Sequence, residues 1–368
     1  MYKRQGYNHS LQGLGDSTSL PNFQYLNPNY VEGSDYEFPS QNISAFVEHI
    51  FALNKYFSIT PGIRFESINT NANGWYRNTV YDLAGNVVFD QKIIDSQTNN
   101  RSFVIGGIGF NYKRNDTLEF YANASQNYRS INFTDMQIQN PNFRIDPNLE
   151  DEKGYNFDLG ARGLIGNKVN YDISLFLLAY NNRIGTAIQT DPVLFNVYQY
   201  RTNIAQSLTK GIEGMVSVDW WKLLMNDTSK LSVRTFINVA LTDARYINSL
   251  EPAYKNKEVE LVPDLTFKTG IRIGYTNMST QIQYTYTSEH FSDATNTLQQ
   301  ANAVNGLIPA YSILDWSIKY KWRRIQLESG INNMLNTIYF TRRATAYPGP
   351  GIIPSPPRNY FLTLQLKL

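Results

Sequence analysis

The side chains in this chain that are best suited to bind a ligand are arginines and tyrosines in segments between apolar runs. The candidates are Arg129, Arg144, Arg183, Arg201, Arg342, Arg343, Tyr128, Tyr200 and Tyr347. A guanidinium offers a planar fork of N–H donors that matches a carboxylate, and a tyrosine ring offers a flat wall. The adjacent pair Arg342–Arg343 is the strongest candidate, because it lies among prolines that would hold it in place. The alternative is that each arginine pairs with a carboxylate of a neighbouring loop.

Residues for catalysis or for a resident metal are not recognisable. His9, His49 and His290 are far apart and lack the spacing of metal ligands. The chain has no cysteine, which excludes disulfides and thiolate metal sites. Asp151 and Glu152 could act as an acid–base pair, but beside a lysine they are expected to be solvated charges. The sequence therefore predicts a protein that is not an enzyme and that has no cofactor.

Composition narrows the class of protein further. The chain has 368 residues, of which 42% are hydrophobic, and a mean hydropathy of −0.39. No run approaches the roughly 18 apolar residues of a membrane-spanning helix. The aromatic share of 14% is high, which is typical of the aromatic girdles of membrane barrels and also of carbohydrate-binding β proteins. A net charge of only +2 gives no reason to expect nucleic acid as a partner.

The apolar residues alternate with polar residues along most of the chain. In the last segment, Tyr360, Leu362, Leu364, Leu366 and Leu368 point one way, and polar residues point the other way. The pattern predicts thirteen strands, most of them long enough for a tilted membrane crossing of about 9–11 residues. They are expected near 42–54, 56–69, 101–113, 117–128, 154–165, 168–180, 208–220, 230–242, 265–276, 278–290, 311–322, 324–333 and 358–368.

The connections between these strands alternate between short and long. The tight turns carry Asn, Gly, Asp or Arg, whereas the long connections are expected at 70–100, 129–153, 181–207, 243–264, 291–310 and 334–357. A longer turn at 222–229 is the exception on the short side. Short turns on one side and long loops on the other are typical of transmembrane barrels rather than of soluble sandwiches. We therefore predict an all-β, antiparallel, up-and-down transmembrane β-barrel over 42–368, and a loop remnant of an upstream barrel segment, with at most one irregular strand, over 1–41.

Three segments resemble a known family. Gly330-Ile-Asn-Asn-Met-Leu-Asn-Thr-Ile-Tyr339, followed by a Pro/Gly-rich loop and a final strand, resembles the C-terminal signature of TonB-dependent receptors. Tyr121-Ala-Asn-Ala-Ser-Gln-Asn-Tyr-Arg-Ser-Ile-Asn132 and Asp146-Pro-Asn-Leu-Glu-Asp-Glu-Lys-Gly-Tyr155 resemble the strand and loop of a middle barrel segment. Tyr339-Phe-Thr-Arg-Arg343 with Tyr347-Pro-Gly-Pro-Gly-Ile-Ile353 looks most like ferric-citrate-type receptors of Bacteroidetes.

This resemblance implies an outer-membrane transporter of a Gram-negative bacterium that imports a ferric chelate, either ferric citrate or a siderophore. The family's barrel has 22 strands around an N-terminal plug. Against those 22 strands, thirteen or fourteen strands imply an incomplete barrel, with the remaining strands, the plug, the TonB box and a signal peptide upstream. The odd count of thirteen agrees with this, because single-chain bacterial barrels close with even strand counts. The implied partners are lipid and lipopolysaccharide, the TonB complex acting through the plug, and the barrel assembly machinery acting on the last strand. The family usually ends on Phe, whereas this sequence ends on Leu368.

Other functions remain open at this point. The cargo could be an oligosaccharide or cobalamin, the barrel could be a passive porin, or the chain could be a soluble aromatic-rich binding protein. The arginines favour an anionic chelate, although each could instead pair with a lipopolysaccharide phosphate. Four further arginines, expected inside the lumen, are predicted to pair with Glu66, Asp158 and plug residues; they are Arg64, Arg162, Arg234 and Arg272.

Overall fold

The computed structural model describes residues 2–12, 33–82, 84–136, 143–190, 197–225, 230–299, 305–344 and 351–367. Fourteen strands lie side by side in one antiparallel sheet, in the order in which they occur in the chain. They are β1 (Tyr2–Gln12), β2 (Ser34–Glu48), β4 (Phe57–Tyr81), β5 (Val87–Asn115), β6 (Leu118–Arg129), β8 (Glu152–Ile165), β9 (Val169–Thr190), β10 (Val197–Asp219), β11 (Leu231–Ser249), β12 (Leu265–Tyr275), β13 (Met278–Thr287), β16 (Tyr311–Trp322), β17 (Ile325–Asn332) and β20 (Asn359–Leu366).

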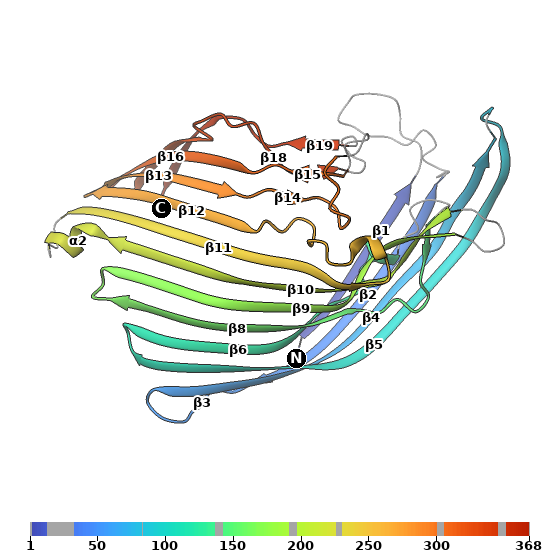
Figure 1. Ribbon diagram of the computed structural model, residues 1–368, viewed down its shortest axis with the longest axis horizontal. Helices are drawn as coiled ribbons and strands as arrows, with labels where there is room; N and C mark the ends of the chain where they lie inside the picture. The colour runs from blue at the N-terminus through green and yellow to red at the C-terminus, as the bar shows by residue number, and fades with distance from the viewer. Residues whose placement is uncertain are drawn as a thin grey trace.

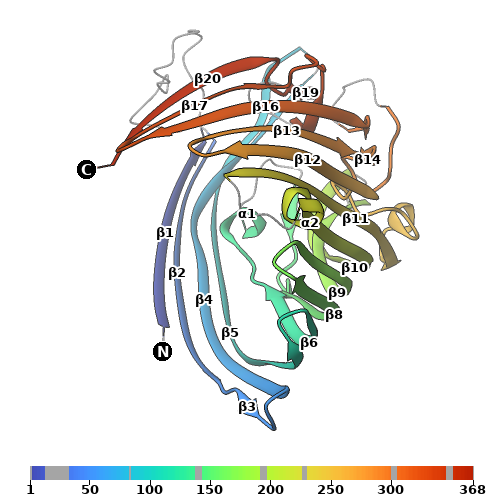
Figure 2. The ribbon, with the colours of Figure 1, turned by 90° about the vertical axis from the view of Figure 1, so that its left-hand side faces the viewer.

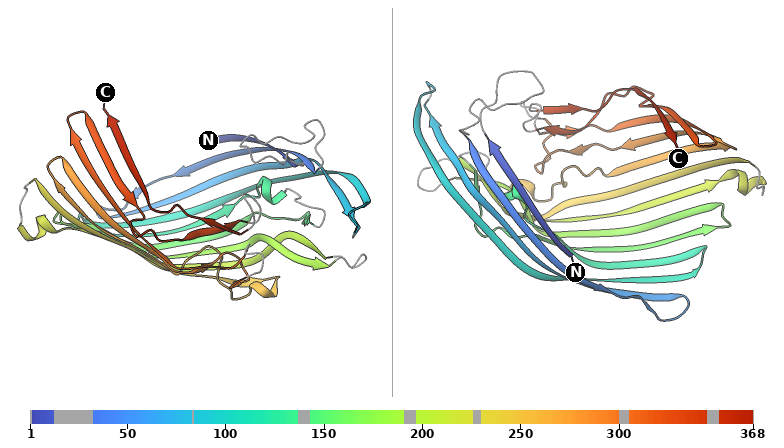
Figure 3. Two further views of the ribbon diagram at one scale, coloured as in Figure 1. Left: turned by 90° about the horizontal axis from the view of Figure 1, so that it is seen from above. Right: turned by 180° about the vertical axis from the view of Figure 1, so that it is seen from behind.

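The sheet is a curved wall rather than a flat layer. Figures 1 and 2 show the strands bending around a concave side, and Figure 3 shows the same trough from above and from behind. Within the described residues, no pairing joins β1 to β20, so these strands are the two edges of the sheet. The observed fourteen strands and their up-and-down order confirm the predicted architecture.

The two ends of the wall differ as predicted. At one end the strands are joined by tight turns, and at Gly166–Asn167 both central residues have positive φ, as a two-residue hairpin turn requires. The other end carries long connections with short elements of their own. These elements are β7 (Phe143–Ile145), β14 (His290–Phe291), β15 (Leu307–Ile308), β18 (Phe340–Ala344), β19 (Gly351–Pro354), α1 (Phe133–Met136) and η1 (Pro252–Tyr254). At the tight-turn end lie β3 (Phe51–Ala52) and α2 (Trp220–Met225).

The outer face of the wall is apolar and exposed. Along β8, Phe157 and Leu159 are exposed, whereas Asn156 and Asp158, which alternate with them, are half-buried on the concave side. Leu362, Leu364 and other apolar residues of the final strand are exposed as well. A soluble protein would bury these faces, so this inverted distribution is that of a wall between lipid and a polar lumen. None of the helices in the described part of the chain is long and apolar enough to cross a bilayer.

Two expectations need correction. The range 1–41, predicted as a loop with at most one irregular strand, holds two regular strand segments: Tyr2–Gln12 forms β1 and β2 begins at Ser34, and the two strands pair over their whole shared length. Much of the predicted loop at 70–100 is also strand, since β4 has 25 residues and β5 has 29. These strands extend well past the length of a membrane crossing as a projecting hairpin (Figure 1).

Two small cores lie on the concave side near the long-loop end. In the first, Tyr36 and Phe38 of β2 pack against Ile131, which precedes α1, and Met136, the last residue of α1. Figure 2 shows α1 inside the curve of the wall. In the second, Tyr246 of β11 packs with Val259, and Tyr254 of η1 covers it. Both cores fold the long connections inward, so that they narrow the mouth of the lumen.

Candidate ligand site at the long-loop end of the barrel

The candidate site begins where β6 ends and α1 turns into the lumen. Arg129, the last residue of β6, donates from its two Nη atoms to Asp135 of α1 and to Glu152 of β8, each at 2.8 Å. Asn132 positions Asp135, because its Oδ1 accepts the backbone N–H groups of Thr134 and Asp135 at the start of the helix. Asp135 and Glu152 are both buried, so Arg129 is held in a fixed orientation.

Arg201 of β10 approaches the same carboxylate from the opposite side. Its Nη2 lies 3.9 Å from Asp135 Oδ1, and its Nη1 donates to Thr186 at 3.4 Å. Burial lowers the pKa of the Arg201 guanidinium below its ordinary value, an effect that the charge of Asp135 opposes. The structure therefore brings Arg129 and Arg201 together around one buried aspartate.

Arg144 and Tyr200 are neighbours in a short parallel pairing. Strand β7 pairs with β10 so that Arg144 lies opposite Tyr200. The Arg144 guanidinium lies over the ring of Tyr198, with Cζ 4.0 Å from the ring centroid, and Tyr198 and Tyr200 are arranged edge to face. This group places a cation and two aromatic rings on β7 and on β10, the strand that also carries Arg201.

Arg183 of β9 reaches toward the second core. Its Nη2 lies 3.8 Å from Glu260 Oε1, and its Cζ lies 5.5 Å from the centroid of the Tyr246 ring. Tyr246 in turn donates to Glu260 at 2.7 Å. Burial raises the pKa of the Tyr254 hydroxyl, and the nearby carboxylates of Glu251 and Glu260 raise it further. Arg183 thus contacts a different carboxylate from those that Arg129 contacts.

Arg342 and Arg343 lie on β18, a different element from those that carry Arg129, Arg201 and Asp135. Arg343 donates to the carbonyl of Leu307 at 2.8 Å and lies over Phe340, so it ties two long connections together. Arg342 is exposed. Tyr128 packs edge to face against Phe103, with ring centroids 4.8 Å apart. Tyr347 falls outside the described residues.

The prediction that Asp151 and Glu152 are solvated charges is wrong. Asp151 is buried and accepts Arg101 Nε at 2.7 Å and the Ile131 N–H at 2.9 Å. Glu152 is also buried and accepts the Ile184 N–H at 3.0 Å. The sequence analysis did not identify Arg101 and Asp135, which pair with Asp151 and Arg129, as residues of the candidate site. The pattern Asn132-Phe-Thr-Asp135 is a helix-start signal that could have located α1 and its carboxylate.

The arginines of the concave wall pair mostly within the wall. Arg64 pairs with Glu66, as predicted. Arg162 does not pair with Asp158, because Glu119 on the neighbouring strand lies directly across from it and takes both Nε and Nη2. Asp158 instead accepts Asn156 and Asn123. Arg234 pairs with Asp219, and Arg272 donates to Ser279.

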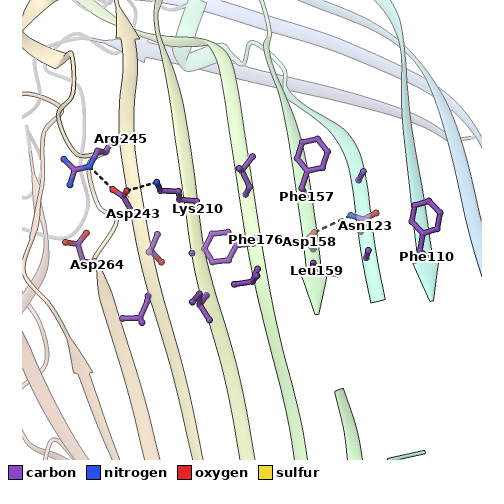
Figure 4. Close-up of a pocket in the computed structure, with 18 residues that line it drawn as sticks. Phe110, Asn123, Phe157, Asp158, Leu159, Phe176, Lys210, Asp243, Arg245 and Asp264 are labelled. Carbon is purple, nitrogen blue, oxygen red and sulfur yellow. Dashed lines mark hydrogen bonds and ion pairs between the residues drawn. The ribbon is translucent and has the colours of Figure 1, made fainter. Parts of the chain in front are cut away.

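A large hollow of about 950 Å³ lies beside β6 and β8–β11 (Figure 4), but it does not belong to the mouth. It is lined by Phe157 and Leu159, which are on the exposed apolar face of the wall. Charged residues border one end, where Asp243 accepts Arg245 at 2.8 Å and lies 3.5 Å from Lys210. The apolar lining and the outward direction assign this hollow to the membrane-facing surface.

Comparison with known proteins agrees with this architecture. The model of the family described as TonB dependent receptor-like, beta-barrel matches residues 2–334. The ferric yersiniabactin uptake receptor FyuA from Yersinia pestis has a similar structure, with a TM-score of 0.69, 17% identity, and 90% of this chain and 46% of FyuA covered. The ferric citrate transporter FecA, in its unliganded form, has a TM-score of 0.65 and 16% identity, with 90% of this chain and 55% of FecA covered.

The cargo differs among proteins of this fold. The copper transporter OprC has a TM-score of 0.67 and 12% identity, and the match covers 96% of this chain and 53% of OprC. The chain therefore spans about half the length of the receptors it resembles. Among curated proteins, no sequence matches it. The family match over most of the chain places it plainly: the chain belongs to the TonB-dependent receptor β-barrel family and is an outer-membrane protein of a Gram-negative bacterium.

Proposed function

We propose that this chain forms part of the barrel wall and of the ligand-binding mouth of a TonB-dependent transporter. The transporter imports an anionic ferric chelate, either ferric citrate or a siderophore complex. The observation that carries the proposal is the grouping of Arg129 and Arg201 around the buried Asp135 on the lumen side of the mouth. The names of two proteins with similar folds, a ferric yersiniabactin uptake receptor and a ferric citrate transporter, support the same cargo class.

The arrangement suits an anion for a physical reason. Arg129 and Arg201 each keep N–H donors beyond those that face Asp135, and their side chains are already held by neighbouring groups. A pre-oriented guanidinium loses little conformational entropy when it binds a carboxylate. Arg144 with its aromatic neighbours and the exposed Arg342 add positive charge and flat surface at the same end of the barrel.

The rest of the transport cycle belongs to the same proposal. The TonB complex would act on a plug domain and open a path along the lumen wall described here. Iron would be cargo and not a resident cofactor, and the protein would act without catalysis. Lipopolysaccharide would surround the exposed apolar face, and the barrel assembly machinery would engage the final strand.

Binding by the receptor in isolated outer membranes tests the cargo class. We expect ferric citrate or a ferric siderophore to bind, while cobalamin and a neutral oligosaccharide of similar size do not. Because the contacts are charged, the affinity should fall as ionic strength rises. The same affinity for a neutral oligosaccharide, without salt dependence, would contradict the proposal. A second experiment reconstitutes the protein, purified from outer membranes, into liposomes. Passive diffusion of small solutes across these liposomes would instead favour a porin.

A further inference from the structure

A short helix lies at the tight-turn rim, at the end of the barrel opposite the candidate ligand site. Helix α2, Trp-Trp-Lys-Leu-Leu-Met, connects β10 to β11 and projects beyond their ends (Figure 1). The sequence predicted only a longer turn here. Asp219 caps the helix, because its Oδ1 accepts the Lys222 N–H at 3.2 Å. The same carboxylate accepts Arg234 Nε at 3.0 Å, which fixes the helix to the wall.

The helix turns its apolar side toward the outside of the barrel. Trp220 Nε1 donates to Thr235 Oγ1 at 2.8 Å. Thr235 is on the same face of β11 as Ile237 and Leu241, which belong to the exposed apolar surface. The hydrogen bond therefore holds the Trp220 ring on the outer side of the wall.

The residues that follow Trp220 continue this apolar side. Leu223 and Leu224 come three and four positions after Trp220, so all three lie on one face of the helix. Trp220 is 40% exposed, Leu223 39%, Leu224 73% and Met225 59%. The side chains of the described residues cover this face only in part, although leaving such apolar residues in water is unfavourable.

Exposed aromatic residues mark the same rim on β12 and β16, which follow β11 in the sheet. Tyr275 ends β12, and Tyr320 and Trp322 lie at the end of β16, all on the outer face and all exposed. Tyrosine and tryptophan concentrate at the boundary between lipid tails and headgroups. The apolar side of α2 is thus continuous with the lipid-facing surface at the level where that surface ends.

We propose that α2 is an interfacial anchor, whose Trp220–Leu223–Leu224 face inserts among the phospholipids of the periplasmic leaflet. The tight-turn side faces the periplasm in bacterial barrels. Lys222 Nζ lies 3.8 Å from Asp219 Oδ2, and the Lys222 side chain is 42% exposed, so its charge can meet lipid phosphates. A short helix of this kind lies in the plane of the interface, with its apolar side about 5–10 Å deep. It fixes the height of the β10–β11 side of the wall in the membrane.

The absence of cysteine makes this inference directly testable. A nitroxide on Leu224→Cys, with the protein in vesicles of phosphatidylethanolamine and phosphatidylglycerol, reports collisions with oxygen and with a water-soluble nickel chelate. We expect the label to favour oxygen, as a label on Leu159→Cys in the lipid-facing belt does. A label on Asn277→Cys, in the β12–β13 turn at the same rim, should favour nickel.

Two results would overturn the anchor. One is a label at position 224 that is as accessible to nickel as the label at 277, which would place the helix in water. The other is a label shielded from both reagents, which would show that protein covers the face. If Leu224→Cys does not reach the folded, heat-modifiable form, Met225→Cys provides the same measurement. An independent readout is the fluorescence of Trp220, obtained as the difference in emission between wild type and Trp220→Phe. Brominated phospholipids should quench this difference.

Discussion

The ring of Tyr121 lies over Gly160, directly opposite it on the neighbouring strand, and a Cβ at position 160 would overlap that ring. The Tyr121 hydroxyl donates a hydrogen bond to Asp172 on the next strand, at 2.7 Å. The ring thereby covers the bare backbone of the glycine. The same cross-strand arrangement recurs at Phe176–Gly211, Phe236–Gly270 and Phe361–Gly330. These pairs pin the register of the wall from within.

Replacing Gly160 with alanine should therefore destabilise the barrel. The new methyl group displaces the Tyr121 ring and breaks its hydrogen bond to Asp172, so the cost is that of overpacking, roughly 1–3 kcal/mol. The midpoint of urea unfolding in lipid vesicles measures the change.

Gly62→Ala is the matched control, because a Cβ there meets nothing closer than 3.8 Å on the Glu48 side chain. Its effect should stay within about 0.5 kcal/mol. In a Tyr121→Ala background, Gly160→Ala should lose most of its cost, since the ring is gone. Equal costs in the two backgrounds would show that the ring is not the cause.

Removing Asp151 should loosen the mouth. Asp151 accepts a hydrogen bond from Arg101 Nε, and the Arg101 side chain is only 14% exposed. Asp151→Ala leaves that cation without its buried partner, at a cost of about 3–5 kcal/mol. Faster proteolysis between β6 and β8 and a lower urea midpoint are the expected observations.

The neighbouring carboxylate provides the control for this change. Glu150 is exposed and accepts Asn182 at 2.9 Å, so Glu150→Ala should cost at most about 1 kcal/mol. Arg101→Ala combined with Asp151→Ala should be less harmful than Asp151→Ala alone, because the double variant leaves neither charge of this pair buried without its partner. Additive effects of the two substitutions would contradict the pairing.

The tip of the β4–β5 hairpin should respond to acid. The Asn86 side-chain amide and the backbone N–H groups of Asn86 and Ala84 donate to the Asp82 carboxylate, and they hold its pKa below the usual value. A lowered pKa in the folded tip means that the stabilisation is complete above about pH 4 and disappears as the pH falls through the lowered value. Hydrogen exchange of the Asn86 amide, corrected for its intrinsic rate, should accelerate in that window.

Asp82→Asn separates the charge from the shape of this turn. The amide oxygen still accepts the backbone N–H groups, but it does not titrate, so the corrected exchange should be flat between about pH 2 and 6. A wild-type profile equally flat over that range would contradict a role for the Asp82 charge.

The wall was predictable from the sequence because the membrane imposes a simple pattern on it. Where a strand such as β8 crosses lipid, apolar and polar residues must alternate, and Phe157, Asp158 and Leu159 display this directly. Above the membrane both faces meet water and the alternation disappears. Stretches such as Asn69-Thr-Asn-Ala-Asn73 therefore resemble loops, although they pair with β2 and β5. Strand β1 escaped prediction for the same reason.

The candidate site was less predictable, because its contacts join distant segments. The types and positions of Arg129 and Arg201 are evident in the sequence, but their shared partner is not. Asp135 lies 66 residues before Arg201 in the chain and is brought to it by the folding of α1 into the lumen. Similarly, the predicted partner of Arg162, Asp158, lies on the same strand. The register of the neighbouring strands, which the sequence does not give, places Glu119 directly across from Arg162, and the two residues form an ion pair.

Arg342 should contribute directly to binding of an anionic chelate. It is exposed on β18 at the long-loop end, and among the described residues no carboxylate lies within ion-pair distance of it. The proposed function therefore predicts that Arg342→Glu weakens ferric chelate binding by about tenfold, equivalent to about 1.4 kcal/mol. Titration of the receptor in isolated outer membranes measures this change, and the difference from wild type should shrink as salt is added.

Arg324→Glu makes the same charge change at the opposite end of the barrel. Arg324 is exposed in the β16–β17 turn, so its reversal alters the net charge without altering the mouth. Its affinity should remain within about twofold of wild type, because charges more than a Debye length of about 8 Å from the ligand are screened. Equal losses in the two variants would trace the effect to net charge. Unchanged binding in Arg342→Glu would remove this arginine from the site while leaving Arg129 and Arg201 to be tested in the same way.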